Sequence, residues 1–150
     1  MGERIFLCVY LGFCSFYDCR TMRIPVWLLH GGLLLGSLYA GGKMISGMAG
    51  WQAVMAGILP GTIMLLYGRL SDGKLGEADG KMVILAGLLQ HWERCTAQVL
   101  AACFLVFFAA MFLLLTQKGT RHTRIPFAPF FLAAVVLLWI GEIFGGLICG

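Results

Sequence analysis

Apolar runs interrupted by clusters of charged residues dominate the pattern along this chain. Runs of this kind are typical of helices that lie in a membrane. They predict six helical membrane segments, at residues 5–19, 24–42, 50–69, 79–93, 96–116 and 126–148. The first and fourth segments are shorter than the roughly 20 residues that usually span the hydrocarbon. These two short segments are also the ones that border an aspartate, Asp18 and Asp79.

The composition agrees with a membrane protein. Apolar residues make up 60% of the 150 residues, charged residues make up only 12%, and the mean hydropathy is +0.89. A soluble domain carries about a quarter charged residues, so this chain lacks the polar surface that would face water. We therefore expect residues 1–150 to form a single membrane-embedded domain, an all-α bundle of about six transmembrane helices.

Basic residues gather in alternate connections between the segments. Eight of the eleven lie in the first, third and fifth connections: Arg20, Arg23, Arg69, Lys74, Lys81, Lys118, Arg121 and Arg124. Arg4, Lys43 and Arg94 lie at the N-terminus and in the other two connections. Cytoplasmic loops carry the excess of Lys and Arg, so we expect these three connections in the cytoplasm and both termini outside. This orientation also accounts for the net charge of +4 without a nucleic-acid partner.

Cysteine and histidine show no metal-binding pattern. The six cysteines include no C-x-x-C pair, and the three histidines are scattered along the chain. A metal site would need clustered ligands, so we expect neither a metal nor a cofactor.

Glycines recur four residues apart in three segments, at Gly32 and Gly36, Gly57 and Gly61, and Gly141 and Gly145. Such pairs let helix backbones approach closely in lipid. With six helices in one chain, internal packing is favoured over homodimerisation, and the oligomeric state stays open.

Two carboxylates are candidates for chemistry. Asp18 lies about 20 Å along a helix that starts near Ile5, which is short of the roughly 30 Å hydrocarbon thickness. It should therefore lie just inside the cytoplasmic boundary. Asp79 stands where a glycine-bearing loop turns into the fourth segment, at the same membrane face. By the same reckoning Glu142 is about 24 Å along a helix from Pro126, near the outer face, where we expect it to hydrogen-bond or snorkel.

Two acids held a few ångströms apart share one proton and divide into an acid and a base. The base can take a proton from water while the acid protonates a peptide carbonyl or the leaving amine. This is aspartic-protease chemistry and needs no metal. On the residues alone another interpretation stays open, in which Asp18 pairs with a nearby arginine and Asp79 merely caps the fourth helix.

Three stretches resemble the type IV prepilin peptidases. "DCRTMRIPVWLL" is similar to the first aspartate motif of that family, in which an arginine-rich turn and Ile-Pro-Asn follow the aspartate. "GEADGK" resembles the second motif, Gly-x-Gly-Asp-x-Lys, and "RIPFAPFFLAA" resembles the Pro-Phe-Ala-Pro-Phe stretch that opens the last helix. The stretches have the order and spacing of the family. The chain departs from it at Ala78, where the motif has glycine, and at Val26, where it has asparagine.

The resemblance implies an aspartic endopeptidase with several membrane helices in a prokaryotic inner membrane. Such an enzyme removes the short basic leader of prepilins and pilin-like proteins at the cytoplasmic face, typically after a glycine. By motif match the catalytic residues would be Asp18 and Asp79, with Gly76 and Lys81 at the flanking motif positions. The chain is similar to the short, peptidase-only form, because it lacks the length and the paired cysteines of the N-terminal methyltransferase portion.

Two other classes of function remain as alternatives. A small proton-coupled transporter would use the two aspartates as relay groups, although the chain shows no repeated halves of the kind that transporters contain. A catalytically degenerate subunit of a pilin-assembly machine would bind pilins without cutting them. Both alternatives predict an intact prepilin where a peptidase would remove the leader.

Overall fold

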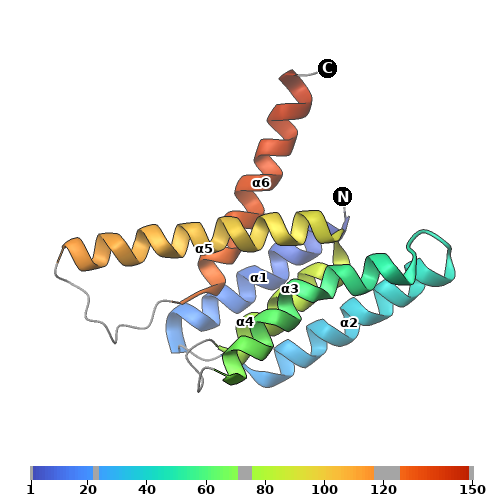
Figure 1. The fold of residues 1–150 in the computed structure, drawn as a ribbon, viewed down its shortest axis with the longest axis horizontal. Coiled ribbons are helices and arrows are strands. Elements are labelled where there is room, and N and C mark those ends of the chain that lie inside the picture. The colour runs from blue at the N-terminus through green and yellow to red at the C-terminus, as the bar shows by residue number, and fades with distance from the viewer. Residues whose placement is uncertain (1, 22–23, 71–75, 117–125, 149–150) are drawn as a thin grey trace.

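The computed structural model describes residues 2–21, 24–70, 76–116 and 126–148. Every element in that part of the chain is helical (Figure 1). In chain order the helices are α1 (Gly2–Thr21), α2 (Val26–Ile45), α3 (Trp51–Leu70), α4 (Glu77–Leu89), α5 (Trp92–Leu115) and α6 (Ala128–Ile148). The predicted all-α fold with six helices is therefore confirmed.

The boundary between the fourth and fifth helices differs from the prediction. Helix α4 ends at Leu89 instead of residue 93, and α5 begins at Trp92 instead of residue 96. Gln90 ends α4 in an extended conformation (φ −121°, ψ 172°), and His91 is extended before α5. Because neither residue is a glycine or proline, the sequence did not mark this turn.

Helix α4 forms the centre of the fold. Seven of its 13 residues are buried, and Met82, Val83 and Leu85 are completely inaccessible. The helix contacts α1, α2, α3 and α5, so its apolar side chains are covered from several directions. A helix that is hydrophobic all round is expected in such a place. The surrounding helices thus fix α4, whose first turn carries Asp79.

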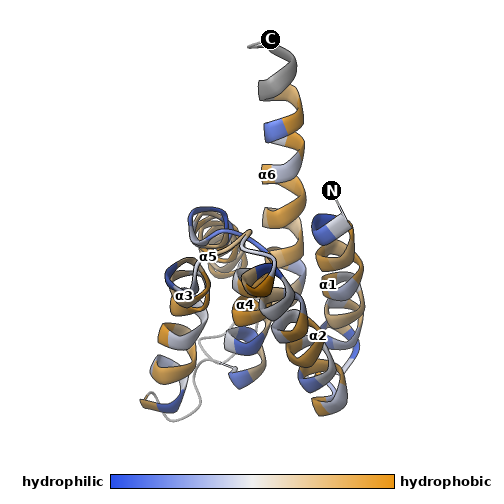
Figure 2. Cartoon of the chain, turned by 90° about the vertical axis from the view of Figure 1, so that its right-hand side faces the viewer, coloured by the Kyte–Doolittle hydropathy of each residue, from blue (hydrophilic) through white to orange (hydrophobic). Residues whose placement is uncertain are grey.

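The outer surface of the fold is apolar. Large hydrophobic side chains are exposed on α1, α2, α3, α5 and α6. Figure 2 shows that hydrophobic residues occur along all of these helices. Phe104 and Leu66, for example, are 66% and 61% exposed. Apolar surface on this scale is unusual for a soluble monomer. Helices α3 and α5 are long and apolar enough to cross a bilayer, and α6 contains a shorter apolar stretch, Ala128–Phe144.

Helices α3 and α4 meet through glycines. A Cβ atom added at Gly57 would lie 2.5 Å from the backbone oxygen of Gly87, and one added at Gly61 would lie 2.5 Å from the backbone nitrogen of Ile84. The two backbones are therefore in direct contact, as predicted for the Gly57 and Gly61 pair. Close approach of this kind needs a residue without a side chain on each helix.

The other two glycine pairs behave differently from each other. A Cβ added at Gly32 would lie 2.5 Å from the ring of Tyr10, and one at Gly36 would lie 2.5 Å from Leu85, so this pair also packs inside the chain. Gly141 has no atom within 4 Å of an added Cβ. The prediction of close packing is thus confirmed for α2 and not for Gly141 of α6.

Helix α6 packs against α1 and α5. Its C-terminal part projects beyond the other helices (Figures 1 and 2). In α5 the buried residues are Cys95, Gln98 and Ala102, all in the first half of the helix. The contacts of α5 therefore concentrate near its start, at the end of the fold where α4 finishes.

Candidate active site

Asp18 lies in the last turns of α1 and contacts the beginning of α6. Its Oδ2 accepts a hydrogen bond from the backbone N–H of Ala128 at 3.1 Å. Ala128 is the first residue of α6, where backbone N–H groups have no partner inside the helix. The carboxylate of Asp18 therefore caps a helix that lies 110 residues further along the chain.

The interpretation in which Asp18 is merely paired with a nearby arginine gains no support from the described residues. The guanidinium of Arg20 lies over the ring of Phe16, 5.2 Å from its centroid. Arg23 lies outside the described residues. The observed partner of Asp18 is the backbone of α6.

Asp79 lies in the first turn of α4 but is not its N-cap residue. The cap position belongs to Gly76, whose carbonyl oxygen accepts a hydrogen bond from the N–H of Asp79 at 3.1 Å. The carboxyl group of Asp79 in turn interacts with the backbone N–H of Gly76, which is how an acid at the third position of a helix helps to cap it. The interpretation in which Asp79 supports the start of α4 therefore stays open beside a chemical role.

The two carboxyl groups come together at one end of the fold. Both side chains are half-buried, and they lie close enough for the charge of Asp18 to act on the carboxyl group of Asp79. Contacts between α1 and α4 set this proximity. The structure thus gathers, from three helices, two acids and the N-terminus of α6.

Gly76 leaves room for the carboxyl group of Asp79. A Cβ atom at position 76 would lie 2.9 Å from Oδ2 of Asp79 and 3.4 Å from its Cγ. The backbone of Gly76 is extended, with φ −66° and ψ 130°, a conformation open to any residue. Glycine at this position therefore leaves space for the Asp79 carboxyl group where it now lies, and its conformational freedom is not used.

We expect Gly76→Ala to displace the Asp79 carboxyl group and to lower any activity that depends on it by about tenfold or more, because small displacements of catalytic groups cost this much. The stability of the fold should change little, since Gly76 itself is exposed. Initial rates and thermal unfolding of the two proteins in the same detergent measure both quantities. Equal rates would show that Asp79 does not need this space.

At both positions where the chain departs from the family motif, the residue present fits the helix that carries it. Ala78 lies inside α4, where its backbone is helical, and it packs against the core. Alanine is the best helix former, so this position does not require the positive φ that only glycine adopts easily. Val26 is the first residue of α2 and is 65% exposed. Neither substitution distorts the helix that carries it.

Lys81, at the last motif position, pairs with Glu77. Its Nζ lies 3.9 Å from Oε2 of Glu77, and Arg69 of α3 lies 3.1 Å from Oε1 of the same carboxylate. These contacts connect the end of α3 to the start of α4, next to Asp79. Among the described residues no three His, Cys, Asp or Glu side chains form a group that could hold a metal ion.

A family model described as the type IV leader peptidase family matches residues 5–116. The matched part contains both aspartates, Gly76 and Lys81, and most of the 150 residues. The chain belongs to the type IV leader peptidase family. No curated protein and no solved structure matches it.

Membership supports protease activity of the leader-peptidase type, and the family implies a pilin-like substrate. The two long apolar helices agree with a membrane protein. The third motif-like stretch, at residues 124–134, lies beyond the matched part. Its first two residues also lie outside the described residues. The start of α6 nevertheless reaches the site through Ala128, a contact that sequence reasoning missed. The only available signal was the Pro-Phe-Ala-Pro-Phe stretch, which marked a helix start without indicating its neighbour.

Proposed function

We propose that this leader peptidase is an aspartic endopeptidase in which Asp18 and Asp79 act as the catalytic pair. The observation that supports the proposal most is the proximity of two half-buried carboxyl groups from α1 and α4. Two carboxyl groups that interact in a protein do not both ionise easily, and in this proposal the pair carries one proton. That state provides a base and an acid in one site.

Both acids lie at the N-terminus of a helix, a place that suits a negative group. Asp18 accepts the N–H of Ala128 at the start of α6, and Asp79 interacts with the backbone of Gly76 at the start of α4. Either acid can therefore carry the charge, and in the mechanism that we propose Asp18 is the base and Asp79 is the acid. Asp18 takes a proton from water as its oxygen attacks the scissile carbonyl carbon, and Asp79 gives its proton to the carbonyl oxygen. Collapse of this intermediate releases the amine, which receives a proton from the pair.

We further propose that six helices cross a prokaryotic inner membrane, with both termini outside and the aspartate pair at the cytoplasmic face. If successive helices cross in opposite directions, the ends of α1 and α3 and the starts of α4 and α6 share one membrane face. Polar contacts between these helix ends support this arrangement. Asp18 meets the start of α6, and Arg69 at the end of α3 meets Glu77 at the start of α4. At the opposite end Glu3 of α1 pairs with Lys43 of α2 at 3.0 Å.

In this arrangement the substrate is a prepilin or pilin-like protein. Its apolar stem lies in the bilayer against the exposed apolar surface of the helices, and its basic leader stays at the cytoplasmic head groups. The junction between leader and stem then reaches Asp18 and Asp79. The partners of the protein in this proposal are the lipid bilayer and the substrate. The proposed reaction uses no cofactor and no nucleic acid.

Co-expression of the full chain with a pilin-like protein from the same genome tests the proposal. We expect mass spectrometry to find a new N-terminus created by removal of the basic leader, and no added methyl group. An unprocessed precursor in membranes that contain the folded protein would contradict the peptidase function. It would favour a degenerate assembly subunit or a transporter.

A further inference from the structure

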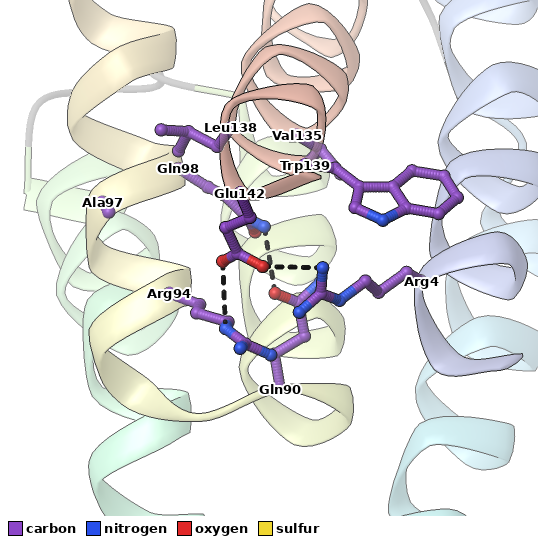
Figure 3. A pocket seen from close by; sticks show the side chains of 9 residues that line it. All are labelled: Arg4, Gln90, Arg94, Ala97, Gln98, Val135, Leu138, Trp139 and Glu142. Atoms are coloured by element: carbon purple, nitrogen blue, oxygen red, sulfur yellow. Dashed lines mark hydrogen bonds and ion pairs between the residues drawn. The ribbon is translucent and has the colours of Figure 1, made fainter. Parts of the chain in front are cut away.

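A second polar site lies beside Arg4, at the opposite end of α1 from Asp18. Figure 3 shows the residues that line it. It is a pocket of about 90 Å³ between α1, α5, α6 and the residue that follows α4. Fourteen residues separate Arg4 at this pocket from Asp18, which corresponds to about 21 Å along α1. The pocket is therefore not part of the proposed peptidase site. Its polar and aromatic lining consists of Arg4, Gln90, Arg94, Gln98, Trp139 and Glu142.

Two amide groups in the pocket have unsatisfied atoms. Gln98 is only 6% exposed, and its Nε2 donates a hydrogen bond to Oε1 of Gln90 at 2.9 Å. The remaining atoms, Oε1 of Gln98 and Nε2 of Gln90, are buried and have no hydrogen-bond partner among the described residues. Buried polar atoms are nearly always paired. Both atoms lie below the surface of the pocket, so a bound molecule gains one acceptor and one donor when the two amide side chains rotate toward it.

The charged groups give the pocket a positive excess. Glu142 pairs with Arg4 at 2.7 Å and with Arg94 at 3.2 Å, so two guanidinium groups share one carboxylate. The sum of these three charges is +1. Each guanidinium carries five N–H donors in a planar fork, and one carboxylate cannot use all of them. Donors therefore remain for a second anion.

Apolar groups form the other wall. Val135, Leu138 and Trp139 of α6 line the pocket. On the same helix Leu137 and Phe144 are 57% and 62% exposed on the apolar outer surface. A molecule in the pocket would thus have charged donors on one side and a lipid-facing surface on the other. A free anion would use only the first of these features, whereas a phospholipid would use both.

We propose that this pocket binds the head group of an anionic phospholipid that carries hydroxyl groups, of the phosphatidylglycerol type. Arg4 and Arg94 bind the phosphodiester, the amide of Gln90 donates to a phosphate or ester oxygen, and a glycerol hydroxyl donates to Oε1 of Gln98. The acyl chains lie along α6. This lipid site goes beyond the peptidase function and does not depend on it.

Native mass spectrometry of the full chain in detergent tests the proposal, with phosphatidylglycerol and phosphatidylcholine added at equal concentrations. We expect one phosphatidylglycerol per chain and at least tenfold weaker retention of phosphatidylcholine. Arg94→Gln should lower phosphatidylglycerol binding about tenfold. Glu142→Gln should strengthen it, because both guanidinium groups are then available to the phosphate. Gln98→Leu should reduce the preference for phosphatidylglycerol over phosphatidic acid, which has no glycerol hydroxyl.

Lys43→Gln is the matched control, since Lys43 is a basic residue at the same end of the fold that does not line this pocket. It should leave lipid binding unchanged. An equal loss of lipid binding in Lys43→Gln would overturn the proposal in favour of general attraction by surface charge. Equal retention of the two lipids would overturn it in favour of a pocket that holds only water. Glycerol phosphate that competes as well as the lipid would overturn it in favour of a free-anion site. Asp18→Asn should bind lipid normally, which separates this result from failure of the peptidase function.

Discussion

Asp18→Asn and Asp79→Asn should each reduce leader cleavage of a co-expressed prepilin by at least about 100-fold, because positioned acids and bases contribute about 10² to 10⁴ in rate. Asparagine keeps the size of the side chain but can neither accept a proton from water nor donate one as a carboxylic acid does. Removal of either group leaves the other unable to complete the proton transfers. The double variant should be no worse than the single variants, since the two groups act as a unit.

The effect must be separated from loss of the protein. Glu93→Gln is the matched control, because Glu93 is an exposed carboxylate in the first turn of α5, away from the pair. Its cleavage rate should equal that of the parent protein. Membrane insertion and thermal unfolding of all variants report the fold. Normal cleavage by either aspartate variant would end the proposal that these two residues form the catalytic pair.

Gly87→Ala should disrupt the packing of α3 on α4 and prevent the protein from accumulating in a folded form. The added methyl group would collide with the backbone oxygen of Gly57, which cannot move to another rotamer. Overpacking of a core costs about 1–3 kcal/mol even where side chains can adjust, and here the obstacle is backbone. We expect the free energy of unfolding to fall by about 3 kcal/mol or more. Leader cleavage should disappear as well, because α4 carries Asp79.

Gly141→Ala provides the comparison for this variant. No atom lies within 4 Å of a Cβ at position 141, and alanine is a better helix former than glycine by about 1 kcal/mol. Its thermal unfolding temperature in detergent should equal or exceed that of the parent protein. If Gly87→Ala unfolds at the same temperature as Gly141→Ala, the close contact between α3 and α4 does not contribute as described.

Much of the fold could be predicted because simple patterns of apolar residues and glycines in the sequence indicate it. Long apolar runs gave the six helices, and the glycines at 57 and 61 indicated a close helix contact that the structure confirms. The boundary at Gln90 could not be predicted, since it depends on how α5 packs and not on a local breaker. The central place of α4 was also hidden, because an apolar helix facing lipid and one facing protein have the same composition.

The candidate site, too, could be predicted only in part from the sequence. Motif residues identified Asp18, Asp79 and Gly76, but the reason for Gly76 is the space beside the Asp79 carboxyl group, which only coordinates reveal. The contacts between Asp18 and Ala128 and between Arg4 and Glu142 join distant parts of the chain. Nothing in either neighbourhood of the sequence indicates its partner. The polar interactions of Glu142 were nevertheless predicted from its place along the helix and are confirmed by its ion pairs with Arg4 and Arg94; its position at the outer face stays a prediction.

The hydrogen bond between Asp18 and Ala128 has a consequence for how the protein matures during synthesis. The ribosome makes the first aspartate early, but the backbone group that holds it emerges only after more than a hundred further residues. Until α6 has been made and packs against α1, Asp18 lacks the partner that orients it. A nascent chain therefore cannot complete the candidate active site before α6 joins the other helices.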